Sequence, residues 1–376
     1  MENIEGVRQN FPITKNKVYL NHAAHSPLPK PAADAMRKHI EELSQYGDAI
    51  DPDDGKTSFA KLINAAKDEV ALVENTSIGL NIIANMLNYP QGSNIVTTDL
   101  EYPSVVYPWK SKKLGVNVRY VKNRAGKIFL EDLERAIDDK TVAVAISHVE
   151  YVNGFRFDLR AVGEIVHEHG AYLVVDAIQS LGALSVDVKR SAVDFLTAAC
   201  YKWMLGPPGV GFLYVRKELI QKFEPPIIGW ASVKPEVFKT LDFWEIRDLK
   251  LSETASRFEV GTPSSVSIAG AVAALNLLLD AGLENIEKRI RALTDHLVEL
   301  LSARGIRFQT PLEPEYRSGI VNFLIDNPQE RTDQLARRGI IVSARSHGIR
   351  VSPHFYNTTN EIDKLVEEAT RQKGNV

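Results

Sequence analysis

The sequence predicts an α/β protein, with a largely parallel sheet covered by helices and a smaller α+β domain after it. Three observations lead to this prediction. Short β-branched runs alternate with amphipathic stretches in the first two thirds of the chain. The residue composition changes after Gly261, where long stretches rich in Ala and Leu begin. The length of 376 residues exceeds that of one ordinary domain and suits two.

The candidate strands and helices of the first part follow one another as in βαβ units. Apolar residues recur at spacings of three and four between the strands, as on one face of a helix. Strands separated by helices of this length pair in parallel and are buried on both faces. The candidate strands are residues 94–97, 117–121, 142–147, 172–176 and 211–215, and the candidate helices are residues 104–114, 130–137 and 159–169.

The last third of the chain predicts the smaller domain. Residues 264–279 and 283–304 have the composition of long helices. Beyond them we expect strands at 320–325, 340–342 and 349–352 and helices at 331–338 and 361–371. The expected division is a large domain over residues 17–281 and a small domain over residues 282–376, with residues 1–16 packed on the small one.

Composition narrows the classes of function. The chain is 44% hydrophobic and 25% charged, and 45 basic against 48 acidic residues give a net charge of -3. This balance leaves no excess of basic residues that would indicate binding to nucleic acid. No apolar run reaches the roughly 20 residues that cross a bilayer. The polar start is unlike a secretory signal, and the single cysteine, Cys200, excludes an internal disulfide. We expect a cytoplasmic protein without nucleic-acid, membrane or metal partners.

Two charged residues are candidates for chemistry. Asp176 ends the strand candidate Tyr-Leu-Val-Val-Asp, and ligands of open α/β sheets bind at the carboxyl ends of such strands. The alternative for Asp176 is a cap on the next helix. Lys202 lies in an apolar segment before a glycine-rich turn, where loss of hydration lowers a lysine pKa and frees the amine as a nucleophile. The alternative for Lys202 is an ordinary surface lysine.

A third element is the Thr76–Ser77 pair, at the start of a candidate helix. Its hydroxyls and the free N–H groups of the first turn can bind a phosphate, or they can serve as an ordinary helix cap. An amine nucleophile, a strand-end carboxylate and a phosphate cradle are together the contacts that pyridoxal 5′-phosphate requires. The three elements therefore predict this cofactor.

Several further motifs occur in an order typical of one family. They are YLNHAA at residues 19–24, EYPS with a later PW at 101–109, VDAIQ at 175–179, YKW with its glycine turn at 201–211, RFEVGTP at 257–263, and IRVS with YNT at 349–358. With these motifs the chain resembles the class V aminotransferase and cysteine desulfurase family of fold-type I pyridoxal phosphate enzymes, over nearly its whole length. The resemblance implies a seven-stranded sheet in the large domain.

The resemblance also implies which residues bind the cofactor. Lys202 resembles the Schiff-base lysine, and Asp176 resembles the partner of the pyridine nitrogen. The other positions that match cofactor contacts are Thr76 and Ser77 for the phosphate, Tyr102 for a ring stacked over the cofactor, Gln179 for its phenolic oxygen, and His148 and Tyr201 for nearby polar positions.

Two further positions imply a substrate contact and a partner. Arg350 resembles the arginine whose planar fork binds the substrate carboxylate. Thr262 resembles a threonine that reaches the phosphate of a neighbouring subunit, which implies a homodimer with shared active sites. His25 is a second candidate for substrate binding, and the remaining candidate pocket residues are His22, Arg156, Arg345 and His347.

The chain departs from the family at two places. Ala199 and Tyr201 stand where many relatives have a serine and a histidine that hold the phosphate. Cysteine desulfurases need a mobile-loop cysteine shortly before the substrate arginine, and residues 342–348, VSARSHG, contain none. Cys200 is two residues from Lys202 and cannot act as a swinging carrier. Desulfuration is therefore not expected.

We expect a pyridoxal-phosphate-dependent transferase that acts on an amino acid through an external aldimine, with Lys202 as the base for the Cα proton. A class V aminotransferase reaction fits best. The short loop is similar to that of isopenicillin-N-epimerase-like members, so epimerisation and β- or γ-elimination stay open. A nucleotide-binding dehydrogenase would need an early G-x-G-x-x-G turn, which is absent. A non-catalytic binding protein of the same fold would not need the Lys202–Asp176 pair.

Overall fold

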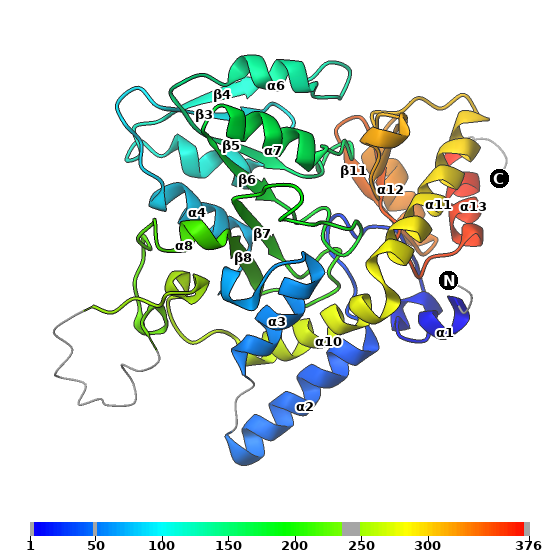
Figure 1. Ribbon diagram of the computed structural model, residues 1–376. Coiled ribbons are helices and arrows are strands. Elements are labelled where there is room, and N and C mark those ends of the chain that lie inside the picture. Colours follow the sequence, from blue (N-terminus) through cyan, green and yellow to red (C-terminus); the bar gives the residue numbers. More distant parts are fainter. Residues whose placement is uncertain (1–3, 48–50, 235–248, 372–376) are drawn as a thin grey trace.

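The computed structural model describes residues 4–47, 51–234 and 249–371. Residues 1–3 and 372–376, the outer ends of the segments expected in the small domain, lie outside the described residues. Figure 1 shows a large body of sheet and helices, with the elements of the C-terminal third gathered beside it.

A seven-stranded sheet forms the centre of the larger body (Figure 1). The strands follow the order β2-β8-β7-β6-β5-β3-β4, and β8 runs antiparallel to both of its neighbours while the other pairs are parallel. This confirms the largely parallel sheet. The strands are β2 (Val70–Val73), β3 (Asn94–Thr98), β4 (Asn117–Val121), β5 (Thr141–Ser147), β6 (Tyr172–Asp176), β7 (Phe195–Ala199) and β8 (Gly211–Val215). The strands β2 and β7 were not predicted from the sequence, because they are short and contain alanine, a weak strand former.

Successive residues of the strands enter two hydrophobic cores, one on each face of the sheet. In β6, Leu173 and Val175 belong to one core and Val174 to the other, because neighbouring side chains of a strand point to opposite faces. The first core includes side chains of α3 (Pro52–Leu62), α6 (Leu130–Ala136), α7 (Leu159–Glu168) and α10 (Ser265–Ala281). The second includes side chains of α4 (Thr76–Met86), α5 (Pro103–Val106) and α8 (Lys217–Ile220).

A third core lies among the elements of the C-terminal third. There β11 (Ser343–Arg345), β12 (Gly348–Val351) and β9 (Val321–Leu324) form an antiparallel sheet in the order β11-β12-β9, which we call the small sheet. The strand β1 (Val18–Tyr19) pairs in parallel with β10 (Ile340–Ile341). The helices α11 (Leu283–Ser302), α12 (Pro328–Arg337) and α13 (Thr359–Thr370) complete this core.

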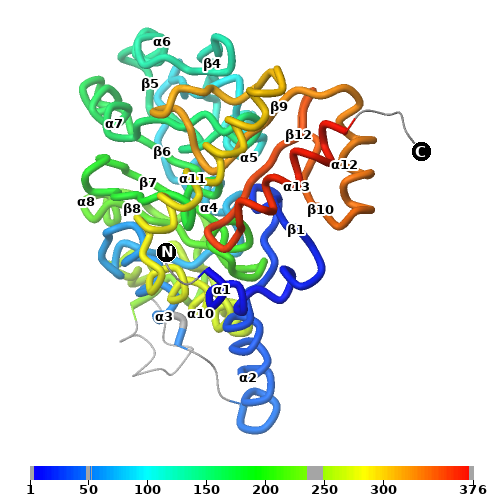
Figure 2. The backbone as a smooth tube through the Cα atoms, turned by 90° about the vertical axis from the view of Figure 1, so that its right-hand side faces the viewer, coloured from blue at the N-terminus to red at the C-terminus, as the bar shows by residue number. Residues whose placement is uncertain are grey.

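The N-terminal segment lies against the same elements (Figure 2). Arg8 forms an ion pair of 2.9 Å with Glu361, and the ring of Phe11 stacks on Tyr356 with centroids 3.8 Å apart. The division into domains at residues 281 and 282 stays a prediction. The remaining elements are α1 (Ile4–Arg8), α2 (Lys30–Tyr46), and the 3₁₀ helices Pro12–Lys15, Lys67–Glu69, Tyr107–Lys110, Trp230–Ser232, Ala255–Phe258 and Pro314–Tyr316.

The predicted length of one helix was wrong. We predicted a single helix over residues 104–114, but α5 ends at Val106 and a short 3₁₀ helix follows it. Pro108 has no N–H to donate within a helix, and its ring clashes with the carbonyl four residues earlier. The α-helix therefore cannot continue through this proline.

Among the described helices, no single one is long and apolar enough to cross a membrane. The helices α10 and α11 meet that test only as a pair, and they are bent by 80° relative to each other.

Candidate active site

Asp176 lies at the centre of the carboxyl edge of the large sheet. In the pairing register it stands between Ser147 of β5 and Thr197 of β7. One of its carboxylate oxygens accepts a hydrogen bond of 2.9 Å from the N–H of Ile178, and its backbone carbonyl accepts one of 2.9 Å from His148. Burial raises the pKa of Asp176 to about 6. The parallel strands thus place a carboxylate at the point where ligands of such sheets bind.

Lys202 follows β7 and is buried near this carboxylate. Its Nζ lies 5.8 Å from the ring centroids of both Tyr102 and Tyr201, and it has no hydrogen-bonding partner among the described residues. Burial lowers the pKa of Lys202 to about 8, in opposition to the charge of Asp176, which raises it. The positive charges of Arg350 and Arg345 also lower this pKa. The amine is therefore much closer to its neutral, nucleophilic form than an ordinary lysine is.

The N-terminus of α4 is fixed next to the end of β7. Oγ1 of Thr76 accepts a hydrogen bond of 2.9 Å from the N–H of Ala199, which leaves the hydroxyl proton of Thr76 free to donate. Ser77 shares a hydrogen bond of 2.8 Å with Ser104. A Cβ added to Gly79 would lie only 2.2 Å from Oγ1 of Thr197, so only glycine permits this approach of helix and strand. Ala199 thus positions the predicted phosphate site through its backbone, although it lacks a hydroxyl.

Arg350 is buried, yet most of its guanidinium nitrogens have no partner in the described structure. Nη1 donates a hydrogen bond of 2.8 Å to the carbonyl of Tyr151, while Nε and Nη2 are buried and unpaired. Its exposed fraction is 1%. Burial, together with the nearby charge of Arg345, lowers the pKa of Arg350 to about 9. Buried polar groups are nearly always paired, so these two nitrogens indicate a site for an anion.

Tyr102 is held at the edge of this site by the residue before it. The carboxylate of Glu101 accepts hydrogen bonds from both the N–H and the hydroxyl of Ser147, at 2.5 and 2.6 Å. Burial raises the pKa of Glu101 to about 8, although the bonds from Ser147 lower it. The ring of Tyr102 meets the ring of Tyr151 edge to face, at a centroid distance of 5.1 Å.

Gln179 and His22 make contacts that fix neighbouring segments. Nε2 of Gln179 donates to the carbonyl of Ala23, and its Oε1 accepts from the indole of Trp203, both at 2.9 Å. An amide nitrogen has two hydrogens, so Gln179 keeps one more donor. Both ring nitrogens of His22 are bonded, to the carbonyl of Ser352 and the hydroxyl of Tyr356 at 2.8 Å, which makes His22 a structural residue.

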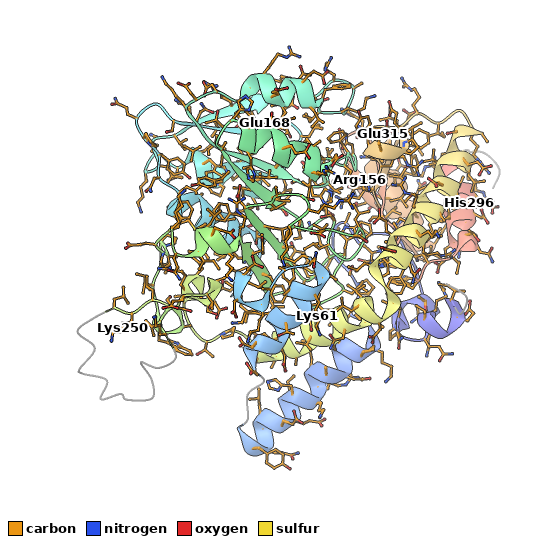
Figure 3. All side chains as sticks on the ribbon, viewed as in Figure 1. Lys61, Arg156, Glu168, Lys250, His296 and Glu315 are labelled. Atoms are coloured by element: carbon orange, nitrogen blue, oxygen red, sulfur yellow. The ribbon has the colours of Figure 1, made fainter. Side chains whose placement is uncertain are left out.

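The remaining candidates lie farther from Lys202 or at the surface. His25 is exposed, with its ring 5.4 Å from that of Tyr201. His347 is exposed in the turn between β11 and β12. His148 lines a cavity of about 340 Å³ together with Arg156 and Glu315, and neither Lys202 nor Arg350 lines it. Figure 3 labels Arg156 and Glu315 among the side chains. Burial lowers the pKa of His148 to about 3, so its ring stays neutral.

Thr262 is exposed in its own chain. It lines a second cavity of about 310 Å³ with Glu74 and Gly209. Of the residues predicted from the sequence, the structure brings Asp176, Lys202, Tyr102 and Arg350 together and leaves Thr262 on the surface of its own chain.

Several residues of the site were missed. Tyr151 contacts both Arg350 and Tyr102, and Glu150 is fully buried beside them. Oε1 of Glu150 accepts a hydrogen bond of 2.9 Å from Thr98, and its Oε2 is unpaired. Burial and the neighbouring Glu101 raise the pKa of Glu150 well above its usual range. Both residues lie within four positions of the end of β5, and this was the available signal.

The described residues fit the cofactor that the sequence predicts. A buried amine of lowered pKa, a strand-end carboxylate and a helix N-terminus with two hydroxyls meet at one edge of the sheet. The unpaired guanidinium of Arg350 adds a place for a carboxylate. The described part of the chain has no group of three His, Cys, Asp or Glu side chains arranged to hold a metal ion.

Comparison with known sequences gives relatives that span nearly the whole chain. Residues 18–365 match the family described as Aminotransferase class-V. The uncharacterized aminotransferase YcbU of Bacillus subtilis is 32% identical over 372 residues, which cover 97% of this chain and 96% of that protein. A probable cysteine desulfurase of Pyrococcus abyssi is also 32% identical, and the alignment covers 96% of each chain.

Comparison with solved structures gives the same fold. The apo structure of the cysteine desulfurase of Thermococcus onnurineus NA1 has a TM-score of 0.87 and 28% identity, and the match covers 96% of both chains. A C-DES variant with glycine covalently linked to the PLP cofactor has a TM-score of 0.86 at 24% identity, covering 96% of this chain and 99% of that one. The second likeness is one of fold.

Proposed function

Because the chain belongs to the class-V aminotransferase family, we propose that it transfers the amino group of an amino acid to a keto acid. It is a pyridoxal-phosphate-dependent enzyme that acts on an amino acid. The observation that carries the proposal is the buried guanidinium of Arg350, with two unpaired nitrogens, near the buried amine of Lys202. An amino acid presents the matching groups, a carboxylate and an amine attached to the same carbon.

Six residues would contact the cofactor. Lys202 would carry it through Nζ, and Asp176 would keep a proton on its pyridine nitrogen. Thr76 and Ser77 would bind its phosphate at the N-terminus of α4, where the helix dipole favours an anion. The ring of Tyr102 would cover one face of the cofactor, and Gln179 has a spare amide hydrogen for its phenolic oxygen.

The bound cofactor supplies a carbonyl carbon that binds amines and a ring that draws electrons from Cα of the amino acid. Arg350 fixes the substrate carboxylate and so sets the direction of the Cα–H bond. Nζ of Lys202 removes the Cα proton, a task suited to an amine whose pKa lies near 8. In transamination the same Nζ would hold this proton and pass it on, while the bound cofactor would keep the amino group and water would supply the oxygen of the released keto acid.

Cysteine desulfurase is the activity named for several relatives, and we propose that this chain does not share it by the persulfide route. That route needs a mobile cysteine near the substrate arginine. The only cysteine of the sequence, Cys200, is fully buried, and burial raises the pKa of its thiol. The turn between β11 and β12 has Ser346 and His347 instead.

A single-turnover experiment tests the reaction. The cofactor-loaded protein is mixed with single amino acids in deuterated buffer, and the keto acid, the recovered amino acid and sulfide from cysteine are measured. We expect a keto acid in an amount equal to the enzyme, with deuterium at Cα of the recovered amino acid. Recovery of the amino acid with inverted configuration at Cα, without any keto acid, would indicate epimerisation. Loss of a side-chain group from the amino acid would indicate elimination. Either result would overturn the proposed transamination.

We also propose that two copies form a dimer with shared active sites. Four apolar side chains near Thr262 are exposed by 40 to 57%, namely Ile227, Ile228, Trp230 and Val260. Their two segments are in contact, since a Cβ on Gly229 would lie 1.9 Å from the carbonyl of Val260. A second copy seated on this patch would cover it and bring Thr262 to the partner's phosphate site.

Sedimentation of the wild type and of Trp230→Glu tests the dimer. We expect a wild-type dimer that buries more than about 2,000 Å², and a variant that shifts toward monomer and loses cofactor affinity. Thr262→Ala should weaken cofactor binding without changing the sedimentation. A cofactor-loaded wild-type monomer would contradict the proposal.

A further inference from the structure

A row of polar residues crosses the small sheet beside the proposed carboxylate site. Ser343 of β11 is paired with Arg350 of β12, and Arg350 is paired with Asn322 of β9. Residues directly opposite each other on neighbouring strands have their side chains on the same face. Arg345 is two residues beyond Ser343 along β11, so it also belongs to this face.

The side chains of this row have more hydrogen-bonding atoms than partners. The buried atoms without a partner are Oγ of Ser343, Oδ1 of Asn322, and Nε and Nη2 of Arg350. Asn322 and Arg350 are 0% and 1% exposed. Asn322 uses its Nδ2 on the carbonyl of Val152 at 2.8 Å, which anchors the loop after β5 to the small sheet. Oδ1 of Asn322 is an acceptor, but the hydroxyl of Ser343 and the two nitrogens of Arg350 can donate. Three unpaired donor groups in one row indicate a ligand with several acceptor oxygens.

Three positive side chains, those of Arg345, Arg350 and Lys202, lie close to one another at this row. The charges of Arg345 and Arg350 both lower the pKa of Lys202, and the charge of Arg345 lowers the pKa of Arg350. Nη1 of Arg345 bonds to the carbonyl of Ala344 at 2.8 Å, and Arg345 forms no ion pair with a described residue. One substrate carboxylate on Arg350 would leave the charge of Arg345 without an opposite charge.

We propose that the substrate is an amino acid with a second carboxylate in its side chain, which binds to Arg345 and the hydroxyl of Ser343. This inference rests on the proposed function, because it assigns the α-carboxylate to Arg350. Diagonal neighbours on paired strands are about 7–8 Å apart, a distance that two arginine side chains can span toward one small dicarboxylate. Aspartate, glutamate and their keto acids are substrates of this class.

Binding of unreactive acids tests the second carboxylate site directly. The cofactor-loaded protein is titrated calorimetrically with succinate, glutarate and butyrate. We expect the better of the two dicarboxylates to bind at least about tenfold more tightly than butyrate, the result of one charge-assisted bidentate contact. Arg345→Gln should remove this advantage and leave butyrate binding unchanged. Arg345→Lys should retain part of it. Arg304→Gln, which removes an exposed arginine just after α11, should change neither.

Equal binding of butyrate and both dicarboxylates by the wild type would overturn the inference. So would an Arg345→Gln variant that loses butyrate and dicarboxylate binding to the same extent, because Arg345 would then act on the first carboxylate only.

A substrate panel separates failure of this inference from failure of the proposed function. Keto-acid release is compared for L-aspartate, L-glutamate, L-alanine and L-norvaline. Preference for the acidic amino acids, lost in Arg345→Gln, supports both proposals. Turnover of the neutral amino acids at equal or higher rates overturns the inference and leaves the transamination intact. Tight binding of a dicarboxylate without any turnover supports the second site and contradicts the transamination.

Discussion

Nη1 of Arg350 donates a 2.8 Å hydrogen bond to the backbone carbonyl of Tyr151. This bond joins the small sheet to the loop that follows β5, and Asn322 makes a second such bond to the carbonyl of Val152. The loop brings Tyr151 against Tyr102, beside Lys202. The contact therefore positions the arginine for a carboxylate and the aromatic rings for the cofactor at the same time.

Arg350→Ala should weaken amino-acid binding at least about tenfold, because a charge-assisted hydrogen bond contributes about 1.5–3 kcal/mol. The visible absorbance of the bound cofactor should remain, since Arg350 would contact the substrate. Titration of this absorbance with amino acids measures the effect. Tyr151→Phe is the control, because it retains the backbone carbonyl that holds Arg350. Unchanged affinity in Arg350→Ala would move the carboxylate site to Arg345 or Arg156.

Lys202 should react with pyridoxal 5′-phosphate at a rate that rises with pH up to about its pKa of 8. Only the neutral amine is a nucleophile, and burial makes it available at lower pH than in an ordinary lysine. The measurement is the rate at which added cofactor enters the cofactor-free protein, followed by borohydride reduction and mass spectrometry. We expect the adduct at Lys202 and none in Lys202→Ala. An adduct at another lysine in the wild type would refute this assignment.

Gly79→Ala should lower the free energy of unfolding by about 1–3 kcal/mol, the usual cost of overpacking a core. The added methyl would lie 2.2 Å from Oγ1 of Thr197 and would push α4 away from β7. Because α4 carries Thr76 and Ser77, the affinity for the cofactor should fall as well. Urea unfolding and cofactor titration measure the two effects. Asn85→Ala, at an exposed position of the same helix, should leave both nearly unchanged.

Glu150→Gln should make the stability less dependent on pH. Burial and the nearby Glu101 raise the pKa of Glu150, and Thr98, Asp99 and Asp176 are its other polar neighbours. Between the pKa of an unfolded glutamate, about 4.3, and this raised pKa, the folded chain holds one more proton than the unfolded chain. The wild type must therefore lose stability as the pH rises through this range, by up to about 1.4 kcal/mol per pH unit.

The glutamine variant carries no such proton, so its unfolding free energy should exceed that of the wild type increasingly as the pH rises. Urea unfolding at a series of pH values from about 5 to 8 measures the difference. Parallel curves for the two proteins would mean that Glu150 is ionised in the folded state.

The sequence by itself predicted five of the seven strands of the central sheet and two main catalytic candidates, Asp176 and Lys202. Runs such as Tyr172–Asp176 are local patterns, and their alternation with helices leaves few ways to pair them. Asp176 and Lys202 could be selected because each follows a buried apolar run, whose end a parallel sheet places at one edge. The proline that ends α5 early is equally local, and there our reading of the apolar spacing was wrong.

Only the tertiary structure decided which polar atoms lack partners. The sequence around Arg350 does not indicate that its Nη1 donates a hydrogen bond to the carbonyl of Tyr151, which is 199 positions away. Nor does it indicate that the other two guanidinium nitrogens are buried and unpaired. The pairing of Ser343 with Arg350 and Asn322 depends on the register of three short strands, and a shift by one residue would turn these side chains to the other face. Desolvation and charge coupling at Lys202, Glu101 and Glu150 depend in the same way on segments that meet only in the folded chain, because both act through space and not along the sequence.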